Sequence, residues 1–153
     1  MKRLLLSLSL LPVLAQAAPG DPAQALLAAA AAGRVQSVED LLAQGADANA
    51  ANATGRPALV MAAYRGNRHS VRALLAAGAT VDAADAQGDT ALIVAAAFGY
   101  LDLVELLVTA GADVNLTNAA GKSALSRATL AGHEAVGERL TQAGAVAEAK
   151  KAK

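Results

Sequence analysis

The sequence predicts an all-α repeat solenoid, in which helix-turn-helix units stack side by side and are joined by short β-hairpin loops. Glycines recur in three series with a period of 33 residues, and apolar residues keep register with them. Such self-similarity is the signature of a repeat architecture. The composition agrees, because 55% of the 153 residues are hydrophobic but only 2% are aromatic. This suits small helices that pack closely, and the length predicts one folding unit.

The three glycine series mark three different breaks between helices. The series that begins at Gly33 interrupts helical stretches too short to form one helix, so it predicts the turn inside a helix pair. The series that begins at Gly45 follows paired apolar residues, where a left-handed glycine commonly ends a helix. The series that begins at Gly55 lies in polar stretches and predicts hairpin tips. The later members are Gly66, Gly99 and Gly132; Gly78, Gly111 and Gly144; and Gly88 and Gly121.

The residues between the glycines predict where helices begin and which faces they bury. Pro57 suits the first turn of a helix, where its missing N–H is not needed. Thr90 and Ser123 hold the equivalent position in later repeats and can accept a hydrogen bond from the helix backbone. We expect Leu74 and Leu107 between stacked repeats. The apolar positions in register are Leu26, Leu59, Leu92 and Leu125; Val38, Val71 and Val104; and Leu41, Leu74, Leu107 and Leu140.

The two ends of the chain differ from the repeats. Lys2 and Arg3 precede an apolar run at 4–14, and small residues follow at Ala15 and Ala17. The run is too short for the ~20 residues that span a bilayer as a helix. This pattern predicts a signal peptide at 1–17 that is cleaved before Ala18, with an ordinary amphipathic N-terminal helix as the alternative. A single repeat domain then covers 18–146, and 147–153 form a solvated basic tail.

Three stretches carry a family resemblance. Residues 88–92 read Gly-Asp-Thr-Ala-Leu, residues 111–115 read Gly-Ala-Asp-Val-Asn, and Gly132 and His133 form a glycine-histidine turn. With the 33-residue period, the chain resembles the ankyrin-repeat family. The resemblance implies about four repeats, at 18–51, 52–84, 85–117 and 118–146. The family's Thr-Pro-Leu-His tetrapeptide lacks its histidine throughout, so the usual threonine–histidine hydrogen bonds cannot form.

The end repeats are expected to be atypical, since one face of each meets water. The first repeat lacks a recognisable hairpin and begins near Pro22 at its first helix. The fourth has Gly137, Arg139 and Thr141 where the third has apolar residues.

The sequence offers no recognisable chemistry, and we expect no catalytic, metal or cofactor-binding residues. There is no cysteine, which excludes disulfide scaffolds and thiol enzymes. His69 and His133 lie nearly two repeats apart, roughly 20 Å at ~10 Å per layer of packed helices, so they cannot share a metal. His69 is expected at the surface. The loop carboxylates Asp47, Asp85 and Asp113 fall at positions that the repeat itself demands.

Partner binding is expected on the hairpin tips and the exposed face of the first helices, as the resemblance implies. Three aromatics, the only ones in the chain, lie on or beside this face. Interface hot spots are enriched in tyrosine, tryptophan and arginine. The alternative is that the aromatics only cover the turns between paired helices. The candidate partner-binding residues are Arg56, Tyr64, Arg65, Gln87, Asp89, Phe98, Tyr100, Lys122 and Leu130.

The expected function is therefore protein binding. Alanine-rich usage and the compact signal favour a bacterial source, so we expect a periplasmic scaffold or accessory factor. The chain resembles exported ankyrin proteins that support periplasmic enzymes, and this resemblance implies that its partner is such an enzyme, for example an oxidative-stress enzyme. The alternatives are a secreted effector or toxin-antagonist binding protein, and an enzyme with an unrecognised site. The net charge of zero does not favour nucleic acid as a partner. We expect a monomer with no stable membrane anchor after signal cleavage.

Overall fold

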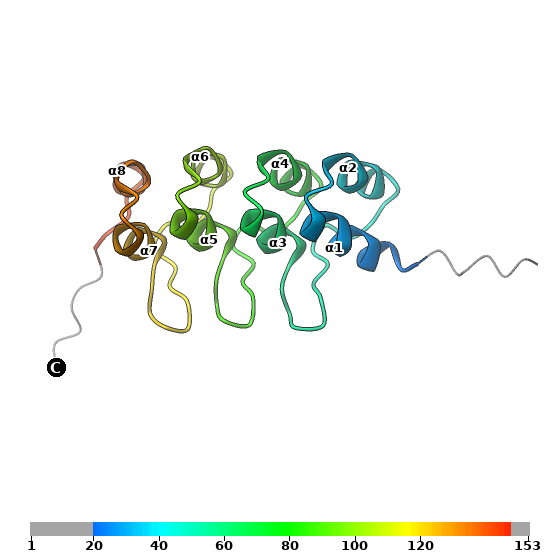
Figure 1. Ribbon diagram of the computed structural model, residues 1–153, viewed down its shortest axis with the longest axis horizontal. Coiled ribbons are helices and arrows are strands. Elements are labelled where there is room, and N and C mark those ends of the chain that lie inside the picture. The colour runs from blue at the N-terminus through cyan, green and yellow to red at the C-terminus, as the bar shows by residue number, and fades with distance from the viewer. Residues whose placement is uncertain (1–19, 148–153) are drawn as a thin grey trace, which may run out of the picture.

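The computed structural model describes residues 20–147, so the expected signal at 1–17, its cleavage site and the lysines of the basic tail lie outside the described residues. Residues 20–147 form eight helices in four successive pairs (Figure 1). The helices are α1 (Pro22–Ala32), α2 (Val35–Ala43), α3 (Ala58–Tyr64), α4 (Arg68–Ala76), α5 (Ala91–Phe98), α6 (Leu101–Thr109), α7 (Ala124–Ala131) and α8 (Glu134–Gln142).

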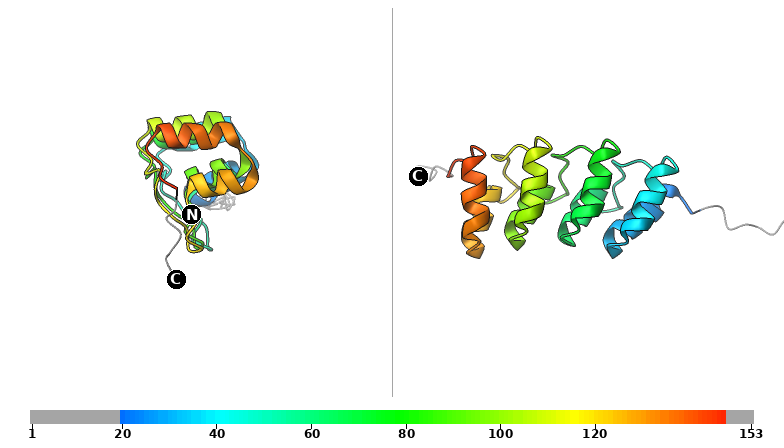
Figure 2. Two further views of the ribbon diagram at one scale, coloured as in Figure 1. Left: turned by 90° about the vertical axis from the view of Figure 1, so that its left-hand side faces the viewer. Right: turned by 90° about the horizontal axis from the view of Figure 1, so that it is seen from above.

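The helices form two layers along the stack (Figure 1 and Figure 2). The first helices of the pairs, α1, α3, α5 and α7, contact one another in order, and so do the second helices, α2, α4, α6 and α8. Three hairpins project from the layer of first helices (Figure 1). Each is closed by one antiparallel bridge, and the bridges join Ala51 to Pro57, Ala84 to Thr90 and Thr117 to Ser123. The predicted all-α repeat fold is confirmed.

The helix starts agree with the sequence at two of three positions. The Thr90 hydroxyl accepts the Ile93 N–H at 3.3 Å, and the Ser123 hydroxyl accepts the Ser126 N–H at 3.2 Å. Pro57 lies one position earlier than expected, because it precedes α3 instead of entering its first turn. Its backbone is extended, with φ −64° and ψ 150°, since the residue also closes the hairpin. The glycines of the series that begins at Gly45 have positive φ, as predicted, and so do those of the other two series.

The core runs without interruption between the two layers. Among the leucines in register, Leu26, Leu59 and Leu92 in the first helices and Leu74, Leu107 and Leu140 in the second are fully buried. Leu41 and Leu125, in the first and last repeats, are half-buried. Fully buried alanines in the first helices leave room for close approach between repeats, which explains an alanine-rich core without aromatics. Within residues 20–147, no helix is both long and apolar enough to span a membrane.

The loops that follow the second helices are joined by one recurring hydrogen bond. The side chains of Asn49, Asp82 and Asn115 accept N–H groups located 31 residues further on. The donors are the backbone nitrogens of Thr80, Asp113 and Val146, at 2.8, 3.0 and 3.0 Å. Because each bond crosses from one repeat to the next, the series fixes the spacing of the stack.

Candidate protein-binding surface

Three aromatic side chains form one cluster at the ends of the first helices. The Tyr64 and Phe98 ring centroids lie 5.9 Å apart with an edge-to-face angle of 73°. The Phe98 and Tyr100 rings stack, with centroids 5.6 Å apart and an interplanar angle of 14°. Phe98 is 50% exposed, although it makes both ring contacts. The aromatic cluster therefore joins the second and third repeats and presents Phe98 to solvent.

Tyr100 has a second role in this cluster. A Cβ added to Gly66 would lie 2.8 Å from Cζ of Tyr100, so the phenol ring covers the turn of the preceding repeat. Tyr100 thus covers a helix-pair turn and also stacks on Phe98. Phe98 remains the exposed member of the cluster.

Arg56 connects the aromatic cluster to the hairpins. Its guanidinium carbon lies 4.7 Å from the Tyr64 ring centroid, and its Nε donates to Oδ2 of Asp85 at 3.3 Å. The Asp85 side chain is only 1% exposed, and its Oδ1 accepts the N–H groups of Gln87 and Asp89, both at 3.0 Å. A buried carboxylate needs such partners. Asp85 is thus a structural residue of the hairpin, as expected for this loop position.

Burial and the nearby carboxylates favour the neutral form of Tyr64. Burial raises the pKa of Tyr64, and the negative charge of Asp89 raises it further, whereas Arg56 lowers it. The raised pKa extends to higher pH the range over which the phenol stays protonated. Its hydroxyl can therefore donate a hydrogen bond to a partner.

Arg65 lines a groove between the first and second repeats. Its Nε donates to the carbonyl oxygen of Ala31 at the end of α1. Together with Arg56, Met61 and Tyr64, these two residues line a groove of about 340 Å³. The groove is open to solvent and lies next to the aromatic cluster, because Tyr64 belongs to both.

The remaining candidates lie further along the same face. The Gln87 carbonyl accepts the N–H of Ala119 at 2.9 Å, and Asp89 accepts the side-chain amide of Asn118 at 2.8 Å. These bonds tie the hairpin of the third repeat to that of the fourth. In the fourth repeat Lys122 is half-buried, and Leu130 is 72% exposed. Arg56, Tyr64, Arg65, Phe98 and Tyr100 are thus brought together, whereas Lys122 and Leu130 make no described contact with them.

Sequence reasoning missed Arg127, an exposed residue of α7. Its charge lowers the pKa of Tyr64, which places it near the aromatic cluster. The signal was available, since Met61 and Val94 hold the same repeat position and make Arg127 the only charge there.

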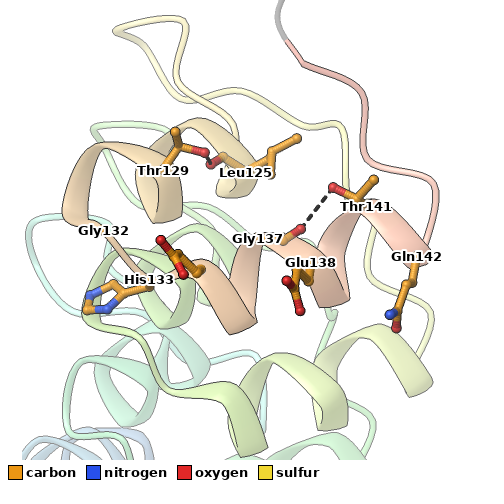
Figure 3. Close-up of a pocket in the computed structure, with 9 residues that line it drawn as sticks. Leu125, Thr129, Gly132, His133, Gly137, Glu138, Thr141 and Gln142 are labelled. Atoms are coloured by element: carbon orange, nitrogen blue, oxygen red, sulfur yellow. Dashed lines mark hydrogen bonds between the residues drawn. The ribbon is translucent and has the colours of Figure 1, made fainter.

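A larger hollow, of about 650 Å³, lies between α7 and α8 at the end of the stack (Figure 3). Its lining includes Thr129, Gly137 and Thr141, where the third repeat has Ala96, Val104 and Val108. The two threonine hydroxyls donate to the carbonyls of Leu125 and Gly137, both at 2.9 Å (Figure 3). This face of the fourth repeat is thus more polar than the equivalent face of the third repeat.

The histidines and acidic residues of the described chain form no metal cluster. No group of three or more His, Cys, Asp or Glu residues within 20–147 could hold a metal ion. His69 is exposed on α4, as expected. His133 precedes α8, and its Nε2 lies 3.1 Å from the Ala97 carbonyl oxygen, so it belongs to the packing between repeats.

Comparison with known protein families agrees with this repeat architecture. A family model described as ankyrin repeats (3 copies) matches residues 26–118. The fourth helix pair, α7 and α8, lies wholly beyond that match and repeats its architecture. No curated protein matches the chain. The chain therefore belongs to the ankyrin-repeat family, whose repeats indicate a protein–protein interaction module.

Proposed function

We propose that this protein is a non-catalytic scaffold or accessory factor that binds a protein partner through its hairpin tips and first helices. The observation that carries the proposal is the half-exposed ring of Phe98. A large aromatic side chain left in water beside two other rings is the kind of group that interfaces use as an anchor.

The side chains around Phe98 support the proposal because they are already ordered. Phe98 contacts Tyr64 on one side and Tyr100 on the other, and Arg56 is held between Tyr64 and Asp85. Immobilising a free, rotamer-rich side chain on binding costs about 0.5–1.5 kcal/mol. Since these groups have lost much of that freedom in the folded chain, a partner gains more of the contact energy.

We further propose that the protein works in the bacterial periplasm and steadies or recruits an envelope protein, with a periplasmic oxidative-stress enzyme as one such partner. Support comes from the sequence of residues 1–17, which has the cationic start, short apolar run and small residues of a cleaved signal. Protein recovered from the producing cell should begin at Ala18 when its intact mass is measured. Accumulation in the medium instead of the periplasm would favour a secreted effector.

The test of binding is affinity capture from periplasmic extract, identification of the captured protein, and titration with that protein purified. We expect Phe98→Ala and Tyr64→Ala to weaken binding by roughly thirtyfold, which corresponds to about 2 kcal/mol for a hot-spot residue. Arg72→Ala and Glu105→Ala are the controls, because both residues are exposed on the second helices. Circular dichroism shows whether each variant is folded. Loss of binding only in the control variants would move the interface to the second helices.

A further inference from the structure

Charge is divided unequally between the binding face and the rest of the protein. We define the binding face as the hairpins and first helices of the last three repeats, residues 52–65, 85–98 and 118–131. It contains four cationic residues and two carboxylates. The rest of the described chain contains four arginines and ten carboxylates. The cations of the face are Arg56, Arg65, Lys122 and Arg127.

The two carboxylates of the binding face already have partners within the protein. Asp85 is buried, and its oxygens accept bonds from Arg56 and from two backbone N–H groups. Asp89 accepts the side-chain amide of Asn118 at 2.8 Å. The four cations and two carboxylates of the binding face give it a net charge of 4 − 2 = +2, and only Arg56 among the cations is paired with one of these carboxylates.

Arg56 and Arg65 present this charge in a form suited to a carboxylate. Both line the groove of about 340 Å³, and the bond that each makes to the protein uses Nε. The terminal amino groups of each guanidinium therefore remain for a ligand. A guanidinium matches the planar geometry of a carboxylate and binds it through paired hydrogen bonds.

We propose that the partner presents an acidic segment, of which one Asp or Glu carboxylate enters the groove between Arg56 and Arg65 while a neighbouring apolar side chain packs on Phe98. Tyr64 connects the two sites, since it lines the groove and contacts the Phe98 ring. This inference rests on the proposed function and adds the chemistry of the partner.

The acidic remainder of the protein makes the binding selective for this face. An acidic segment is attracted to residues 52–65, 85–98 and 118–131 and repelled by the surfaces around them, which orients the encounter. The same carboxylates disfavour nucleic acid, because a phosphate backbone extends beyond the binding face and meets the acidic surfaces around it.

The test is selection of a displayed library of random peptides on the full purified chain. We expect the enriched peptides to contain Asp or Glu next to an apolar residue. Their affinities are then measured by fluorescence anisotropy with Arg65→Gln, Arg65→Lys and Phe98→Ala. Arg65→Gln should weaken binding by about tenfold, the loss expected for a hydrogen bond between charged groups, and Arg65→Lys by less. Binding should also weaken from about 50 mM to about 300 mM NaCl.

Arg72→Gln is the matched control, because it removes the same charge from an exposed position on α4 and should change affinity little. Arg56 is not substituted, since its loss would strand the buried Asp85 carboxylate. A thermal melt of each variant shows whether Arg65→Gln leaves the fold intact.

The outcomes separate this inference from the proposed function. Enriched peptides that lack Asp and Glu but lose affinity with Phe98→Ala would overturn the acidic preference and leave the binding face in place. Peptides unaffected by both Phe98→Ala and Arg65→Gln would contradict the face itself. Failure to enrich any peptide would overturn the proposal that the partner presents an acidic segment. Tighter binding of an oligothymidylate than of the peptides would overturn it too.

Discussion

The imidazole of His133 lies against Gly99 so closely that a Cβ added to this glycine would be 2.6 Å from Nδ1 of the ring. Tyr100 lies against Gly66 in the same way. In each case the residue that follows a turn glycine packs on the turn glycine of the preceding repeat, 34 positions earlier. Glycine is therefore required at positions 66 and 99 for two reasons. The backbone there is left-handed, and the next repeat approaches too closely for a side chain.

Gly99→Ala is expected to destabilise the chain more than Gly132→Ala. Both glycines are left-handed, with φ of 73° and 77°, so both substitutions impose a similar backbone strain of roughly 1–2 kcal/mol. Only at Gly99 does the new methyl group also meet the imidazole, whereas nothing lies within 4 Å of a Cβ at Gly132. The additional loss should be about 1–3 kcal/mol in urea unfolding. His133→Ala in the Gly99→Ala background should recover part of it, and purely additive effects would contradict the steric explanation.

Leu74→Ala and Leu107→Ala should each lower the free energy of unfolding by about 2–5 kcal/mol. Both leucines are fully buried, Leu74 in α4 and Leu107 in α6. Leu130→Ala is the control, because its side chain is 72% exposed and the same truncation should change stability by less than about 0.5 kcal/mol. Urea midpoints equal to that of the parent chain for both buried positions would show that the repeat register is wrong.

Asp82→Asn should stabilise the protein. Asn49 and Asn115, at the equivalent position, each accept a backbone N–H and also donate to a glycine carbonyl, at 3.4 and 3.2 Å. The Asp82 carboxylate accepts the Asp113 N–H but has no hydrogen to donate. An amide restores the missing bond to the Gly111 carbonyl, for a gain of about 1 kcal/mol. A melting temperature at or below that of the parent chain would contradict this explanation.

Ser70→Ala should also stabilise the protein. Ser70 is fully buried in α4, and its hydroxyl has no hydrogen-bond partner. An unpartnered buried polar group costs about 1–3 kcal/mol, although the small void left by its removal offsets part of the gain. We expect an increase of about 0.5–1 kcal/mol in urea unfolding, aided by the higher helix propensity of alanine. Ser37→Ala, at the half-buried equivalent in α2, should have a smaller effect.

Tyr64 should ionise at higher pH than a tyrosine in the unfolded chain. In Tyr100→Phe it is the only tyrosine, so absorbance of the phenolate reports it alone. Burial raises the pKa of Tyr64, and Asp89 raises it further, so Asp89→Asn should move the midpoint back down. Because the unfolded chain releases this proton first, the free energy of unfolding should fall as the pH rises beyond about 10. An identical midpoint in the folded protein and in concentrated urea would contradict the assignment.

The sequence-based predictions of helix starts and ends that the structure confirms concern contacts within one repeat. Thr90 and Ser123 cap their helices through groups three residues away, and the left-handed glycines end helices within the same unit. The sequence pattern placed Pro57 inside the first turn of α3, one position too late. Pro57 instead precedes the helix, because it pairs with Ala51 to close the hairpin, and this contact cannot be seen in the local sequence. Helix boundaries are in general less certain than the existence of the helices.

By itself the sequence determined the solenoid and its repeats, because these depend on periodicity within 33 residues. Only the tertiary structure decided which side chains meet across repeats. The Arg56–Asp85 pair, the Tyr64–Phe98 contact and the packing of His133 on Gly99 join residues 29 to 34 positions apart. The physical reason is that such contacts depend on how each repeat is shifted and rotated on its neighbour. That placement follows from packing of the buried leucines and alanines and cannot be read from the period alone.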